Sequence, residues 1–304
     1  MKIKNYLIAV DLDGTLISGF DNYDKKSFKL LKKLSKHNHV VIATGRPLRS
    51  SVYYYNLLKL KTPIINYNGA LIQNPNDVNF KKQMIHIQKE DLLKFLKDNN
   101  DIIETVFCEI EDDIYLHKET SYIHPYLHQE GGKITIGPLE AHLEGNPNGA
   151  IIFSKLNSEE RLKKYIEDTF NGRIMIRFWY VKEVVVSEFY SPDTSKANAL
   201  KTVCEYYNIP EDKIIAIGDG HNDIEMIKFA NYGVAMENSH PELKEVAKYH
   251  TKSVKESGVY SFLKELNKKL WGFYFFKHWL IFIIIIKYKR KIVLFCLNKQ
   301  IIVH

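Results

Sequence analysis

The chain has 304 residues, of which 45% are hydrophobic, 26% charged and 12% aromatic. These proportions are those of globular proteins, and they exclude a collagen-like, a disordered or a wholly membrane-embedded chain. The length suffices for about two domains. The cysteines Cys108, Cys204 and Cys296 form no CxxC pair. We therefore expect neither a disulfide framework nor a thiolate zinc site, and a cytoplasmic location.

The net charge of +7 has its source at the C-terminal end. Residues 267–304 hold eight Lys or Arg and no Asp or Glu, whereas residues 1–266 hold 35 basic and 36 acidic side chains. A body that is almost neutral lacks the electrostatic field of a polyanion-binding protein. No nucleic-acid partner is therefore expected.

The first 70 residues alternate between two kinds of pattern. Apolar runs predict buried strands over Tyr6–Val10, Val40–Ala43 and Pro63–Tyr67. Apolar residues at helical spacing predict helices over Lys25–Lys36 and Leu48–Leu60. Strands that alternate with helices imply parallel strands in a layered α/β sheet.

The pattern changes after residue 83. Residues 84–186 mix helical stripes with strand-like runs, which predicts an inserted α+β domain with its own sheet. From Lys196 the alternation resumes, with strands expected at Ile214–Ile217 and Gly233–Ala235. The expected parts are a core of residues 1–83 and 187–266, an inserted domain of residues 84–186, and an apolar and basic C-terminal extension of residues 267–304.

Four polar clusters each follow an apolar strand of the chain, the first, second and fourth directly. The carboxyl ends of parallel strands meet at one edge of a sheet, where ligands bind. Clusters that are far apart in the sequence should therefore converge. They are Asp11-Leu12-Asp13-Gly14-Thr15, Thr44-Gly45-Arg46, Lys196, and Gly218-Asp219-Gly220-His221-Asn222-Asp223.

The converging carboxylates predict a metal site. Like charges at close range repel unless a cation lies among them, and a set of oxygen ligands without Cys or His favours a hard ion such as Mg²⁺. Thr44, Lys196 and the backbone N–H groups of the Gly-containing turns are groups that bind phosphate. Together they predict a phosphoryl-transfer site. The carboxylates are those of Asp11, Asp13, Asp219 and Asp223.

Asp11 and Asp13 suit two different roles. Residues two apart in an extended segment point the same way, so both can reach one phosphoryl group. Asp11 would attack phosphorus and form an aspartyl-phosphate. Asp13 would protonate the leaving oxygen and then deprotonate the incoming water.

These motifs, in this order, resemble the haloacid dehalogenase-like (HAD) phosphatase superfamily, and in particular its Cof-type branch, subclass IIB. The resemblance covers about residues 4–266. Further matches are Asn68-Gly69-Ala70, Glu188, and Val234-Ala235-Met236 with Asn238. It implies a Rossmann-like core with a parallel sheet and an inserted α+β cap of the C2 type (C2B). Such a cap selects the substrate and excludes water.

The resemblance also implies a role for each matching residue. Asp11 is the nucleophile and a Mg²⁺ ligand, and Asp13 is the acid/base that offers its backbone carbonyl to Mg²⁺. Thr44, Gly45 and Lys196 hold the phosphoryl group. Asp219 binds Mg²⁺ directly, and Asn222 and Asp223 bind it or orient its ligands. Substrate or cap contacts are assigned to Arg46, Asn68 and Asn238.

The expected substrate is a small phosphorylated metabolite, with sugar phosphates first and phosphorylated cofactors such as flavin mononucleotide or pyridoxal phosphate next. A phosphomutase and a non-catalytic sugar-phosphate sensor remain open as alternatives, and the oligomeric state is not predicted. Cap residues that are candidates for substrate contact, with packing or a solvated face as the default, are His117, Lys118, Tyr122, His124, Arg177, Trp179 and Lys182.

The C-terminal extension allows three interpretations. Its longest uninterrupted apolar run, Trp279–Ile286, has eight residues, well short of the ~20 that span a bilayer. A basic run, Lys287–Lys291, follows it. The extension is an accidental addition, a membrane contact through the tail, or a packed or oligomerising helix.

Overall fold

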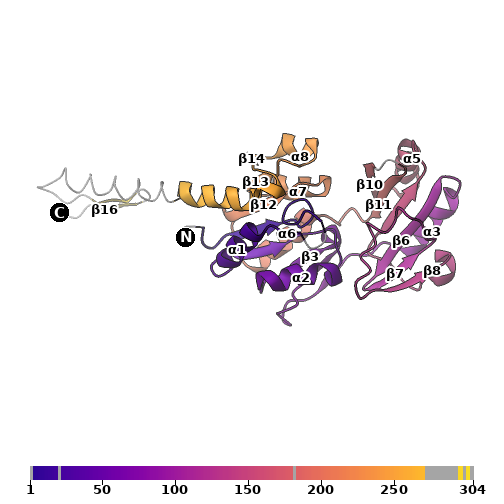
Figure 1. Cartoon of the computed structure of the whole chain (residues 1–304), viewed down its shortest axis with the longest axis horizontal. Coiled ribbons are helices and arrows are strands. Elements are labelled where there is room, and N and C mark those ends of the chain that lie inside the picture. Colours follow the sequence, from indigo (N-terminus) through magenta and orange to yellow (C-terminus); the bar gives the residue numbers. More distant parts are fainter. Residues whose placement is uncertain (1–2, 20–21, 181–182, 271–293, 297–298, 302–304) are drawn as a thin grey trace, which may run out of the picture.

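The computed structural model describes residues 3–19, 22–180, 183–270, 294–296 and 299–301. These residues form two domains, which we call the core and the cap, and a short C-terminal hairpin of β15 (Leu294–Cys296) and β16 (Lys299–Ile301) (Figure 1). The expected apolar and basic runs at Trp279–Ile286 and Lys287–Lys291 lie outside the described residues. No helix of the part of the chain described here is long and apolar enough to cross a membrane.

The core contains a five-stranded parallel sheet in the order β14-β13-β12-β1-β2. This arrangement confirms the predicted α/β class, since the strands come from both ends of the chain and β1 pairs with β2 on one side and β12 on the other. The strands are β1 (Leu7–Val10), β2 (His39–Ile42), β12 (Ile214–Gly218), β13 (Tyr232–Ala235) and β14 (Tyr249–His250).

The third expected strand departs from this parallel pattern. β3 (Ile64–Asn66) touches the sheet through a single parallel bridge between Ala43 and Ile65. It pairs instead in antiparallel fashion with β4 (Leu71–Gln73). β4 pairs in turn, also antiparallel, with β5 (Gln83–Met84). The chain reverses after β3 in a 3₁₀ turn, so the sheet ends there in a hairpin.

Alternation along β1 fixes the two layers of the core. Ile8 and Val10 face one hydrophobic cluster and Leu7 and Ala9 face the other. The first cluster is covered by α1 (Lys25–Leu34), α2 (Leu48–Leu58) and the helix of residues 258–270. The second is covered by α6 (Lys196–Tyr206), α7 (Ile224–Phe229) and α8 (Pro241–Val246). The 3₁₀ helices of the core are η1 (Tyr67–Gly69), η2 (Glu211–Lys213), η3 (His221–Asp223) and η4 (Val254–Glu256).

The cap is built on a six-stranded sheet in the order β10-β11-β9-β6-β7-β8, antiparallel except between β7 and β8. Phe95, Phe170 and Phe189 pack between one face of this sheet and its helices. The elements are α3 (Lys89–Asp98), β6 (Ile103–Ile110), β7 (Asp113–Leu116), β8 (Lys133–Ile136), α4 (Leu139–His142), β9 (Ala150–Ser154), α5 (Glu159–Phe170), β10 (Met175–Tyr180) and β11 (Val185–Tyr190).

The predicted boundary between cap and core at residue 186 is wrong, because it falls inside β11. This strand runs to Tyr190 and pairs with β9 as far as Phe189. Glu188 therefore belongs to the cap sheet, whereas the sequence places it in the core. At the other boundary, Met84 still pairs with Leu71 of the core.

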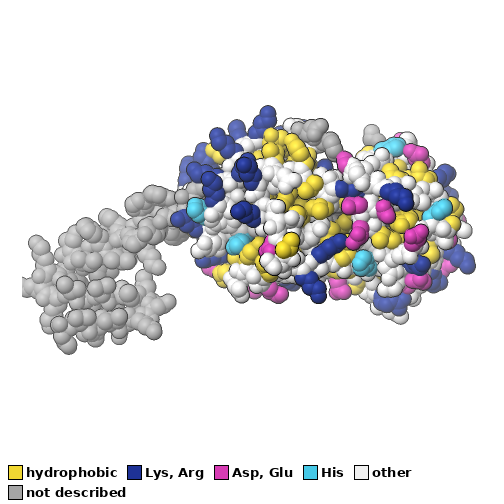
Figure 2. All heavy atoms as spheres, turned by 90° about the horizontal axis from the view of Figure 1, so that it is seen from below, with side chains coloured by type: hydrophobic (Ala, Val, Ile, Leu, Met, Phe, Trp, Pro, Cys, Tyr) yellow, Lys and Arg dark blue, Asp and Glu magenta, His cyan; other side chains and the backbone are white. Residues whose placement is uncertain are grey.

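The described surface carries both basic and acidic side chains, as the near balance of charges in residues 1–266 predicts (Figure 2). Figure 2 shows basic and acidic side chains interspersed with hydrophobic ones over the cap and the adjoining part of the core, and mostly basic ones at the end of the core away from the cap.

The packing of Phe95 predicts the stability of the cap. Its side chain is fully buried and contacts Tyr165 and Phe189, so Phe95→Ala should lower the free energy of unfolding of the cap by about 3–5 kcal/mol. Chemical denaturation would measure this change. The control is Leu156→Ala, since Leu156 is 51% exposed in the same domain and its change should stay within about 0.5 kcal/mol. Equal effects of the two substitutions would contradict the packing described here.

Candidate active site

A buried lysine joins the two halves of the core. Lys196, the first residue of α6, is 0% exposed and donates hydrogen bonds of 2.7 Å to Asp11 and of 2.7 Å to Asp223. Burial disfavours its ammonium form, but the two carboxylates outweigh burial and raise the pKa of Lys196. The side chain therefore stays charged and partly balances the carboxylates around it.

Asp11, Asp219 and Asp223 form an acidic cluster. One carboxylate oxygen from each lies within 4.8 Å of the others, so the three could hold a metal ion. Burial raises the pKa of Asp11 well above its usual range, with the neighbouring carboxylates adding to the effect and Lys196 opposing it. Burial and then Asp223 raise the pKa of Asp219 to about 7. Three carboxylates facing one ammonium leave a surplus of negative charge that a cation would offset.

Local turns hold these carboxylates in place. Asp223 accepts 3.0 Å hydrogen bonds from the backbone N–H groups of Asp219 and Gly220, and it is fully buried. Asp219 accepts from the Thr15 hydroxyl at 2.7 Å and from Asn238 at 3.2 Å. The acidic cluster is thus oriented by hydrogen bonds before any ligand binds.

Glycine is required at two close approaches. Gly14 has φ of +77°, and a Cβ there would lie 2.1 Å from Oδ2 of Asp219. Gly69 has φ of +106°, and a Cβ there would lie 2.2 Å from the carbonyl oxygen of Ser195. L side chains rarely adopt such angles. Gly14 therefore lets the loop after β1 approach Asp219, and Gly69 lets the turn after β3 approach the start of α6.

Asp13 lies apart from the acidic cluster. Arg46 donates two hydrogen bonds to its carboxylate, at 2.7 Å from Nε and 2.6 Å from Nη2. The Asp13 side chain is 53% exposed, whereas that of Arg46 is 6% exposed. Burial lowers the pKa of Arg46 less than Asp13 raises it, so the guanidinium stays charged. The Asp13 carboxylate is thus accessible to a ligand in the cavity that it lines with Asp11.

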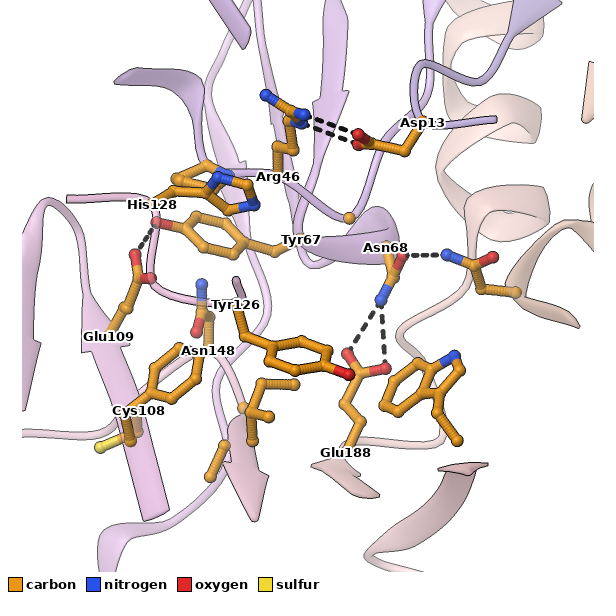
Figure 3. A pocket seen from close by; sticks show the side chains of 18 of the residues that line it. Asp13, Arg46, Tyr67, Asn68, Cys108, Glu109, Tyr126, His128, Asn148 and Glu188 are labelled. Atoms are coloured by element: carbon orange, nitrogen blue, oxygen red, sulfur yellow. Dashed lines mark hydrogen bonds and ion pairs between the residues drawn. The ribbon is translucent and has the colours of Figure 1, made fainter. Parts of the chain in front are cut away.

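A cavity of about 260 Å³ lies between the core and the cap. Asp11 and Asp13 line it from the core. Figure 3 shows Arg46, Tyr67 and Asn68 on the core side of this cavity. Its cap side is formed by Phe107, Cys108, Glu109, Tyr126, His128, Asn148, Trp179 and Glu188.

Hydrogen bonds cross from core to cap around the cavity. Asn68 donates to both Glu188 oxygens at 3.1 Å and accepts from Asn222 at 2.7 Å. Arg49 and the Tyr67 hydroxyl donate to Oε2 of Glu109 at 2.7 and 2.6 Å. These contacts hold the cap against the core.

All of the sequence-predicted site residues except Thr44 fall into two groups. Asp11, Lys196, Asp219 and Asp223 lie together, and Asn238 joins them through Asp219 and the carbonyl of Gly14. Other predicted residues line the cavity and make no hydrogen bond with the acidic cluster among the described residues. They are Asp13, Gly45, Arg46, Asn68 and Asn222.

Thr44 is fully buried, and its hydroxyl accepts from the backbone N–H of Arg46 at 3.1 Å. This contact holds the turn between β2 and α2. Asn222, expected to bind the metal or to orient its ligands, donates its amide nitrogen to Asn68 Oδ1 at 2.7 Å.

The cap residues were predicted less well. Of the seven candidates, Trp179 lines the cavity, and Arg177 reaches it through an ion pair of 2.9 Å with Glu188. His117, Lys118, Tyr122 and His124 are not among the lining residues, and Lys182 lies outside the described residues.

Four further residues line the cavity although no sequence motif points to them: His128, Tyr126, Glu109 and Asn148. Burial, together with the charge of Arg46, lowers the pKa of His128 to about 4, so its imidazole is neutral at pH 7. The one signal in the sequence was Glu109 itself, a charged residue in the apolar run of β6. A charge that is buried in such a strand needs a partner.

An α/β core that places a carboxylate cluster at its strand ends and a buried lysine at the start of α6, under a cap, has the arrangement of a phosphoryl-transfer enzyme. The family model of haloacid dehalogenase-like hydrolases matches residues 8–263, and the chain belongs to this family. The predicted resemblance is thereby confirmed.

Relatives and solved structures agree with this assignment. The chain is 34% identical to YitU of Bacillus subtilis, a 5-amino-6-(5-phospho-D-ribitylamino)uracil phosphatase, over 268 residues that cover 87% of this chain and 98% of YitU. A haloacid dehalogenase-like hydrolase of Bacteroides thetaiotaomicron has the same fold, with a TM-score of 0.72 at 23% identity over 86% of this chain and 100% of its own. So does a subclass IIB sugar phosphatase, with a TM-score of 0.71 at 19% identity over 86% of this chain and 99% of its own. The predicted enzyme class, a phosphatase, is confirmed.

The contacts of Lys196 predict the effect of removing its charge. Lys196→Met leaves Asp11 and Asp223 buried without a counter-charge, so it should lower the free energy of unfolding of the metal-free protein by about 3–5 kcal/mol. Urea denaturation would measure the loss. The matched control is Lys201→Met, an exposed position on the same helix, which should change stability by no more than about 0.5 kcal/mol. An unchanged stability of the Lys196 variant would show that the ion pairs of Lys196 with Asp11 and Asp223 make no net contribution to the free energy of unfolding.

Proposed function

We propose that the chain is a Mg²⁺-dependent phosphatase that hydrolyses a small phosphomonoester through an aspartyl-phosphate on Asp11. The observation that carries this proposal is the position of Asp11. Its carboxylate is fixed by Lys196, belongs to the acidic cluster, and lines a cavity that the cap closes. A nucleophile held in a covered site is protected from competing water.

The donor set fits a hard divalent ion. The ligands that the cluster offers are carboxylate oxygens. Burial first, and the neighbouring carboxylates after it, raise the pKa values of Asp11 and Asp219. We assign Asp11 and Asp219 as metal ligands, with the backbone carbonyl of Asp13, and Asp223 and Asn222 as residues that support them. The ion would supply positive charge that offsets the phosphoryl oxygens.

The residues of the chain then divide the reaction. Lys196 donates one hydrogen bond to Asp11 Oδ1, and the other oxygen of this carboxylate has no hydrogen bond from a described residue and is the one to attack phosphorus. Gly45 lines the cavity and holds the phosphoryl oxygens with Lys196. The Thr44 hydroxyl, which accepts from the backbone N–H of Arg46, keeps its own hydrogen to donate to these oxygens. A bond forms between Asp11 and phosphorus as the bond to the leaving oxygen breaks.

Asp13 carries the proton. It gives a proton to the leaving oxygen and later takes one from the water that attacks the aspartyl-phosphate, which restores Asp11. A protonated Asp13 cannot accept both hydrogen bonds from Arg46, so one of them is released in the acid form. Arg46 thus orients the acid/base residue from within the core.

The cavity favours a substrate with one phosphate and a neutral leaving group. The one Lys or Arg among its described lining residues is Arg46, which is paired with Asp13. A phosphomutase rebinds a bis-phosphate and needs a second cationic site, so this observation favours hydrolysis. We propose a phosphorylated ribityl-pyrimidine of the kind that YitU dephosphorylates as the first substrate to test, ahead of sugar phosphates.

The assigned ligands predict how Mg²⁺ affects stability. Mg²⁺ added to the metal-free protein should raise the Tm, because an ion present at about 100 times its Kd stabilises the native state by about 2.7 kcal/mol. Asp219→Asn should reduce this shift in Tm strongly, and Asp212→Asn, an exposed position in η2, should preserve it. A full shift in the Asp219 variant would remove Asp219 from the ligand set.

The nucleophile is tested by phosphate release from a panel of small phosphoesters with Mg²⁺ or with EDTA. Asp11→Asn should lower turnover at least about 10³-fold, because the amide does not attack phosphorus. Asp168→Asn, on the exposed surface of α5, is the control and should retain activity.

Turnover that survives in Asp11→Asn would refute the aspartyl-phosphate. A folded, Mg²⁺-bound wild type that releases no phosphate from any ester would refute the phosphatase proposal itself.

A further inference from the structure

The cap wall of the cavity holds an amide without a partner. Asn148 is 7% exposed, and its Nδ2 makes no hydrogen bond with the described residues. The residue lines the cavity. Buried polar groups in native proteins are nearly always paired, so an orphaned donor on a ligand cavity indicates a group that the ligand supplies.

A hydrogen-bond acceptor is fixed next to this donor. The backbone N–H of Asn148 donates to the carbonyl of Glu109 at 3.2 Å, which makes the two residues neighbours on the cavity wall. Arg49 and Tyr67 both donate to Oε2 of Glu109, and no described residue donates to Oε1. Since Arg49 balances the charge, Oε1 suits a neutral N–H donor. In Figure 3, Asn148 is seen between Glu109 and Tyr126.

The remaining walls suit a flat ring. Tyr67, Phe107, Tyr126 and Trp179 line the same cavity. Aromatic side chains bind planar ligands through their faces and edges. A planar group in this space would meet the amide of Asn148 and the carboxylate of Glu109 along its edge.

We propose that Asn148 and Glu109 recognise the lactam edge of a planar heterocycle in the leaving group. Asn148 Nδ2 donates to a ring carbonyl, and Oε1 of Glu109 accepts from the adjacent ring N–H. This inference rests on the proposed phosphatase function and makes Asn148 a specificity-determining residue. Sites that hydrogen-bond a substrate discriminate strongly against an analogue without the matching group, because their buried polar atoms are then left unpaired.

The test compares two substrates that share the phosphate and the ribityl chain. One is 5-amino-6-(5-phospho-D-ribitylamino)uracil, and the other is ribitol 5-phosphate, which has no ring. The measured quantity is the ratio of their kcat/KM values. Asn148→Ala should lower this ratio about 10- to 100-fold. Asn148→Asp, which replaces the donor by an acceptor at almost the same size, should lower it at least as much and is the second variant if Asn148→Ala does not fold.

The matched control is Asn100→Ala, an exposed asparagine of the cap, which should leave the ratio within about twofold. An unchanged ratio in both Asn148 variants would overturn the proposal. Equal losses for both substrates would also overturn it, since they would assign Asn148 to the framework of the site.

A binding measurement separates this inference from the phosphatase proposal. Calorimetry with the ring compound without phosphate, 5-amino-6-(D-ribitylamino)uracil, requires no turnover. Asn148→Ala should weaken its binding about 10- to 100-fold relative to the wild type. If the wild type hydrolyses neither ester but shows this difference in Kd, the function proposal fails and the ring site stands. Equal Kd values, or no binding to the wild type, would refute the ring site.

Discussion

The site depends on one buried ammonium group. Lys196 lies between Asp11, at the end of the first strand, and Asp223, which the chain reaches only after the whole cap. Buried charges are costly unless they are paired and hydrogen-bonded, so these three side chains stabilise one another only when both halves of the core sheet have come together. The pairing of β1 with β12 therefore assembles the fold and the reactive carboxylates at the same time.

The same constraint explains why the site favours a ligand. Each carboxylate that the fold buries without full compensation raises the energy of the empty site, and the cluster exceeds the charge of Lys196. Sites of this kind are unfavourable for stability and are found where binding or catalysis requires them. The hydrogen bonds to Asp219 and Asp223 orient the carboxylates so that little reorganisation is needed when a cation and a phosphate arrive.

The core half of the site could be predicted from the sequence and the cap half could not. Asp11, Asp219 and Asp223 were placed together because parallel strands share one edge, a rule that needs no side-chain detail. The antiparallel cap sheet has no such edge, and the route of residues 117–132 decides which side chains reach the cavity. The position of His128 depends on that route, and the position of Asn148 depends on the register of the strands beside it. Short sequence patterns encode neither. The boundary at 186 failed for a related reason. Glu188 resembles the polar end of a strand, but its contacts with Arg177 and Asn68 allow it to be buried within one.

Three ion pairs around the cavity also limit which leaving groups it accepts. Arg46 is matched by Asp13, Arg49 by Glu109 and Arg177 by Glu188. Each guanidinium is therefore paired within the protein, and a second anionic group on a substrate would have to displace a carboxylate from a short contact that is buried on both sides at Glu109 and Glu188 and on the arginine side at Asp13. Truncating such pairs is costly because it leaves a charge uncompensated, and a ligand that competes for them meets the same opposition. A neutral group that hydrogen-bonds at its edge leaves the pairs intact. In the proposed reaction these pairs therefore disfavour a second anionic group in the leaving group, while Lys196 and the metal ion that the acidic cluster would hold offset the charge of the single phosphate.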